Sequence, residues 1–153
     1  MKKITFGFFI LFCFFLFIRT SFSQSATTIL DILKTATDKV EKLEDDNQEV
    51  VNFTIELLVG TKNSKTVYRN LDNSFTYTLT CIPDRKISNL TLTVYKKVGE
   101  EWKYYDEDSG TKPELTFKPK EYGLYEISVK ADSFTKDWTA GHFALIIYHV
   151  IPK

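Results

Sequence analysis

Residues 89–95 read Asn-Leu-Thr-Leu-Thr-Val-Tyr, an unbroken alternation of polar and mostly apolar side chains. Successive side chains of a β-strand point to opposite faces, so this stretch predicts a strand with one buried and one exposed face. Residues 75–81 upstream and 125–129 downstream alternate in the same way. The period of two therefore recurs on both sides of the starting segment and predicts a sheet.

Shorter strands are expected at residues 53–57, 102–105 and 115–117, and a mostly apolar strand at 142–151. Turn signals separate them at Gly60, at Gly99 and in residues 106–110. Strands that recur roughly every ten to thirteen residues are typical of a sandwich or barrel and not of βαβ units. We predict an all-β domain over residues 50–153, an antiparallel, jelly-roll-like β-sandwich of about seven or eight strands.

One amphipathic helix is predicted before the sheet, over residues 25–47. Apolar side chains at Ile29, Leu33, Ala36, Val40 and Leu43 have spacings of three and four, which place them on one stripe. The pair Thr28 and Asp31 resembles a capping box. The stripe either covers a sheet of the same chain, or stands as a stalk, or packs on a second copy.

The first 23 residues have the order of parts of a secretory signal peptide. Lys2 and Lys3 precede an uncharged apolar run at residues 6–18, and Ser21 and Ser23 predict cleavage before Gln24. An uncleaved anchor and a lipoprotein at Cys13 are the alternatives. The run is short of the roughly 20 residues that a spanning helix needs. We expect export to the periplasm, the extracellular space or the cell surface, with membrane contact only through this segment.

Charge and cysteine content exclude several classes of protein. The chain has 20 basic and 20 acidic residues, and removing residues 1–23 leaves 17 basic against 20 acidic. That balance argues against a nucleic-acid binder. Cys81 is then the single cysteine, so a disulfide-rich miniprotein is excluded. Its place in an alternating strand predicts a buried thiol that packs as a small hydrophobe, with an intermolecular disulfide as the alternative.

The order of segments over residues 74–150 resembles the bacterial pre-peptidase C-terminal (PPC-like) β-sandwich family. The resemblance rests on the strand ending in Val94-Tyr95, the acidic residues 106–108 and the Gly-x-Tyr-x-Ile-x-Val run from Gly123. It implies a sandwich fold and an accessory role beside secreted peptidases, although this chain has no room for a peptidase. Gly123-x-Tyr125 is also similar to a tyrosine corner, in which the phenol bonds to upstream backbone.

Motifs for catalysis are missing from the sequence. No Gly-x-Ser-x-Gly element and no glycine-rich phosphate loop occurs. His142 and His149 are seven residues apart in one predicted strand, so they point to opposite faces and cannot share a zinc ion. We therefore predict a protein that is not an enzyme.

Acidic and aromatic residues supply the candidate binding sites. Asp106, Glu107 and Asp108 cluster in a predicted turn and are candidate Ca²⁺ ligands, although a solvated turn is the simpler interpretation. Trp102, Tyr104 and Trp138 are candidates for a flat platform, with core packing as the alternative. We expect a non-catalytic interaction or accessory module for a protein or glycan partner; the alternative is a carbohydrate-binding module that uses exposed aromatic residues.

Overall fold

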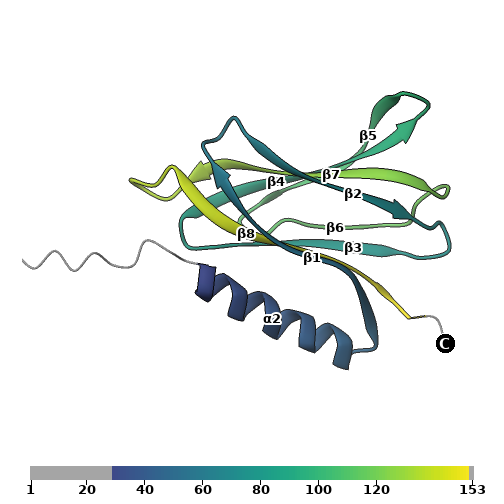
Figure 1. The fold of residues 1–153 in the computed structure, drawn as a ribbon, viewed down its shortest axis with the longest axis horizontal. Coiled ribbons are helices and arrows are strands. Elements are labelled where there is room, and N and C mark those ends of the chain that lie inside the picture. Colours follow the sequence, from purple (N-terminus) through teal and green to yellow (C-terminus); the bar gives the residue numbers. More distant parts are fainter. Residues whose placement is uncertain (1–28, 152–153) are drawn as a thin grey trace, which may run out of the picture.

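A computed structural model describes residues 29–151, and the expected signal peptide at 1–23 lies outside these residues. Two four-stranded antiparallel sheets pack face to face, and one helix lies against the outside of one sheet (Figure 1). The predicted β-sandwich with a leading helix is confirmed. The elements in chain order are α2 (Ile29–Asp45), β1 (Gln48–Val59), β2 (Ser64–Leu71), β3 (Tyr77–Pro83), β4 (Ile87–Val98), β5 (Glu101–Gly110), β6 (Glu114–Phe117), β7 (Gly123–Phe134) and β8 (Ala140–Val150).

The two sheets have the strand orders β1-β8-β3-β6 and β2-β7-β4-β5. We call them the helix-covered sheet and the open sheet. Strands that are adjacent in sequence often lie in different sheets, as β1 and β2 do. The strand order therefore depends on contacts between distant segments, of which β4 with β7 and β1 with β8 are the most extensive.

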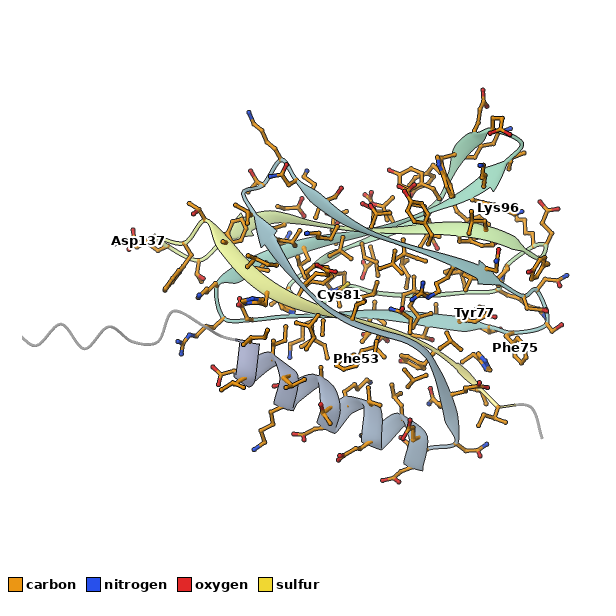
Figure 2. The ribbon with its side chains drawn as sticks, viewed as in Figure 1. Phe53, Phe75, Tyr77, Cys81, Lys96 and Asp137 are labelled. Atoms are coloured by element: carbon orange, nitrogen blue, oxygen red, sulfur yellow. The ribbon has the colours of Figure 1, made fainter. Side chains whose placement is uncertain are left out.

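Alternate side chains of both sheets meet in one apolar core. Leu90, Leu92 and Val94 of the starting segment are fully buried, as their alternation predicts. Cys81 lies between the sheets as a free, buried thiol, which confirms its expected role as a small hydrophobe (Figure 2). Burial raises the pKa of this thiol well above its usual range, because the thiolate would lose its hydration.

Helix α2 packs on its own domain, against the outer face of β1, β8 and β3. The predicted stripe is buried at Ala36 and Leu43 and half-buried at Val40, but at its start Ile32, which is 2% exposed, takes the place of Ile29 and Leu33, which are each 43% exposed. Ile32 and Ala36 pack on Ala144, and Leu43 packs on Ile146 and Tyr148. The small side chain of Ala144 lets the helix approach β8 closely at this point. The surface of the sheet therefore decides which apolar side chains of the helix are buried, which their spacing in the sequence does not.

One predicted turn is wrong, and one strand was not predicted. Residues 106–110 are the second half of strand β5 and not a turn, because they pair with Leu90 to Val94 of β4. Strand β2 was not expected, because it has few apolar side chains. It is an edge strand that pairs only with β7 and buries Leu71 at one end, so it needs little apolar alternation.

In residues 29–151 no helix is both long and apolar enough to cross a membrane.

Candidate functional site

The outer face of the open sheet carries a group of aromatic side chains. Strand parity places Tyr68 of β2, Tyr95 of β4 and Tyr104 of β5 on this face, since Val67, Val94 and Tyr105 next to them point into the core, and Trp102 shares the parity of Tyr104. Tyr68 pairs with Glu126 of β7, Glu126 pairs with Tyr95, and Tyr95 pairs with Tyr104. These residues form one row across all four strands, and together with Trp102 we call them the aromatic face.

The rings of this face contact one another and remain open to solvent. The ring centroids of Tyr68 and Trp102 are 5.5 Å apart, and those of Tyr95 and Tyr104 are 6.3 Å apart. Trp102 is 37% exposed and Tyr104 is 64% exposed. Sequence reasoning identified these two and missed Tyr68 and Tyr95, because only the pairing of β2 with β7 and of β4 with β5 brings them together.

A β-bulge shapes the hairpin that holds Trp102. Along β4 and β5 the register shifts between Val94 and Tyr95, so Tyr105 of β5 has no partner in β4. A bulge increases the local twist of a strand pair, and the hairpin tip rises from the open sheet (Figure 1). Tyr105 points inward, with its ring centroid 5.2 Å from that of Phe117, while Trp102 and Tyr104 stay on the outer face.

Trp138, the third aromatic candidate, lies elsewhere. It is in the loop between β7 and β8, with the Nζ atom of Lys86 4.3 Å from its ring centroid. Figure 2 shows its neighbour Asp137 at one end of the sandwich and Lys96, which follows Tyr95, towards the other. The structure therefore brings Trp102 and Tyr104 together and leaves Trp138 out of their group.

The three acidic candidates for calcium do not converge. On strand β5 the side chain of Glu107 points to the face opposite to those of Asp106 and Asp108. Glu107 accepts a hydrogen bond from the Thr93 hydroxyl at 3.0 Å, and Asp108 accepts one from the backbone N–H of Glu114 at 2.8 Å. Among residues 29–151 no three potential metal ligands form a group.

The two histidines lie near opposite ends of β8, in different surroundings. His142 pairs with Leu57 of β1, and its Nδ1 atom is 3.7 Å from a carboxylate oxygen of the buried Asp84. His149 is buried, and its ring stacks on Phe75 with centroids 4.2 Å apart. The two side chains point to opposite faces of β8, as their odd spacing predicts, so the rings do not share a site.

Negative charge surrounds part of the aromatic face. Partial loss of hydration, followed by the carboxylates of Glu107 and Asp106, raises the pKa of the Tyr104 phenol. Two lysines on or beside this face lie close to acids: the Nζ atom of Lys97 is 3.8 Å from a carboxylate oxygen of Glu100, and that of Lys130 is 3.6 Å from one of Asp132. The face therefore combines exposed aromatic rings with a carboxylate-rich surrounding.

Several solved structures have a similar fold. One is CorA of Methylomicrobium album BG8, a surface-associated copper-binding protein, with a TM-score of 0.52 and 12% identity over 65% of this chain and 93% of that one. Another is the pre-peptidase C-terminal domain of a Bacillus anthracis collagenase, with a TM-score of 0.47 and 15% identity over 63% and 87%. A third is PliG of Aeromonas hydrophila, a periplasmic inhibitor of g-type lysozyme, with a TM-score of 0.45 and 13% identity over 64% and 84%.

These likenesses concern the fold. They include a pre-peptidase C-terminal domain, the family that residues 74–150 resemble, and the sandwich fold that this resemblance implies is the fold of the described residues. No protein-family model matches the sequence, and no curated protein matches it. The chain is an antiparallel β-sandwich, and its function has to be argued from its own surface.

Proposed function

We propose that this protein is an exported, non-catalytic binding module that recognises its partner through the aromatic face. The main support is the unequal cover of the two sheets. Helix α2 packs over the outer face of one sheet, whereas no element of residues 29–151 lies flat over the aromatic face. Single exposed aromatic rings are common on protein surfaces and need no explanation. A group of them on one face marks a surface for recognition.

Of the two partner classes, a protein or a glycan, the arrangement of the rings favours a glycan. The row from Tyr68 to Tyr104 spans three inter-strand gaps, which is about 14 Å at roughly 4.8 Å per gap. Such a row suits an extended chain of repeating flat units better than a single small molecule. Each ring offers a flat apolar surface, and phenol and indole groups add hydrogen-bond donors.

Binding to immobilised and soluble polysaccharides tests this proposal. The double variant Trp102→Ala/Tyr104→Ala should bind at least about tenfold more weakly, since each stacked ring contributes on the order of 1 kcal/mol beyond its buried area. Trp138→Ala is the matched control, because it removes an exposed tryptophan from the far end of the sandwich. Circular dichroism and thermal unfolding should show that all variants stay folded.

Two results would contradict the proposal. One is polysaccharide binding that the double variant retains in full. The other is binding that Trp138→Ala abolishes, which would move the site to the loop between β7 and β8.

Export has its own test: the mature protein should begin at Gln24, as N-terminal sequencing or intact mass of the secreted product would show.

A further inference from the structure

Glu126 occupies the centre of the aromatic face. It is on β7, the second strand of the open sheet, and pairs directly with Tyr68 on one side and Tyr95 on the other. Directly opposite side chains in an antiparallel pair have Cβ atoms about 5 Å apart. The half-buried carboxylate of Glu126 is therefore flanked by two phenol rings, with Tyr104 beyond Tyr95 and the Trp102 ring against Tyr68.

This carboxylate has no cationic partner within residues 29–151. It makes no ion pair and no side-chain hydrogen bond there, whereas the nearby Lys97 and Lys130 are engaged with Glu100 and Asp132. The faces of aromatic rings carry negative charge and attract cations, with tryptophan the strongest. A carboxylate set among such rings adds an opposite charge at the same place. Both features favour a positively charged group above Glu126.

We propose that the ligand of the aromatic face is a glycan that contains protonated amino sugars, with an ammonium group at Glu126 and sugar rings stacked on Trp102 and the tyrosines. This inference rests on the proposed function, since it takes glycan binding at this face as given and adds the charge of the ligand. The length of the row favours a polymer of amino sugars over a lone alkylammonium ion, because a single ion would contact only the centre of the row.

Three oligosaccharides of equal length and linkage isolate the charge. They are β-1,4-linked hexamers of glucosamine, N-acetylglucosamine and glucose, which differ only at carbon 2. Titration calorimetry is done in mild acid, where the amines are protonated but glutamate, with an ordinary pKa of about 4.3, stays ionised. We expect the glucosamine hexamer to bind at least about fivefold more tightly than the neutral two. Added salt should reduce only the additional affinity for the glucosamine hexamer.

Glu126→Gln should remove the preference, so that the glucosamine hexamer binds no more tightly than the two neutral hexamers. Glu41→Gln on the exposed side of α2 makes the same change in net charge away from the face and should have no effect. Equal binding of all three hexamers, abolished by Trp102→Ala but indifferent to Glu126→Gln, would overturn this inference and keep the proposed function.

Two other outcomes also overturn it. Binding of none of the hexamers, together with Glu126-dependent binding of a lysine-rich peptide, would assign the face to a protein partner. A preference for the glucosamine hexamer that Glu126→Gln retains and Glu41→Gln removes would place the charge recognition on the helix side of the sandwich.

Discussion

The phenol oxygen of Tyr125 donates a hydrogen bond of 3.1 Å to the backbone carbonyl of Glu121, four residues upstream. This is the contact that the Gly123-x-Tyr125 order predicts, and it ties the entry of β7 to the preceding loop. The Tyr125 ring is fully buried and lies 5.5 Å from the Tyr105 ring, centroid to centroid. One side chain thus fixes both the start of the central strand β7 and the place where β5 bulges inward.

Tyr125→Phe should lower the free energy of unfolding by about 1 kcal/mol, because it removes one hydrogen bond and leaves the carbonyl of Glu121 near solvent. Chemical denaturation measures this change. Tyr122→Phe is the matched control: Tyr122 is exposed, and its hydroxyl makes no hydrogen bond within the described part of the chain. Equal stability of the two variants would show that the corner contributes nothing.

Stability should fall at high pH through the same side chain. Burial, followed by the charges of Tyr105 and Glu121, raises the pKa of Tyr125 from 10.0 to about 12. The native state therefore holds the phenol proton more tightly than the unfolded chain does. This contribution is complete below pH 10 and is lost as pH rises towards 12. Denaturation from pH 9 upward should show a steeper loss in the parent protein than in Tyr125→Phe; parallel curves would contradict it.

Gly141→Ala should destabilise the protein, because a methyl group there has no room. An added Cβ atom would lie 2.7 Å from Ile87 and 2.8 Å from the carboxylate of Asp84. Overpacking of this kind costs about 1–3 kcal/mol. Gly110→Ala is the control, since nothing lies within 4 Å of its added atom. A melting temperature that drops equally in both variants would argue against the close approach at Gly141.

Ile32→Ala should cost about 2–4 kcal/mol and loosen helix α2, since Ile32 is the buried anchor of its first half. Leu30→Ala on the exposed side should change stability by less than about 0.5 kcal/mol. Hydrogen exchange of the helix amides, compared with those of β8, would show whether α2 detaches before the sandwich unfolds. A larger effect at Leu30 would mean that the helix buries its other face.

Most of the strands could be predicted from the sequence, because side-chain alternation is a local property. Leu90, Leu92 and Val94 had to share one face whatever strand lay beside them, and so did Tyr125 and Ile127. Trp102 and Tyr104 were identified for the same reason. Residues 106–110 were misassigned because acidic and glycine residues favour turns, and only the ladder with β4 extends the strand through them.

The local sequence pattern determined that polar and apolar side chains alternate as in the strands of a sandwich. It also determined that Cys81 points into the core and that Tyr125 forms the hydrogen bond of a tyrosine corner. Tertiary structure alone decided that Ile32, and not Ile29 or Leu33, anchors the start of α2, and it placed the unexpected strand β2 beside β7. That pairing sets Tyr68 next to Glu126. The ring of Tyr68 also lies against that of Trp102, which is 34 positions further along the chain. The physical reason is that side-chain parity acts within one strand, whereas strand order is settled by the burial of surfaces that are distant in sequence.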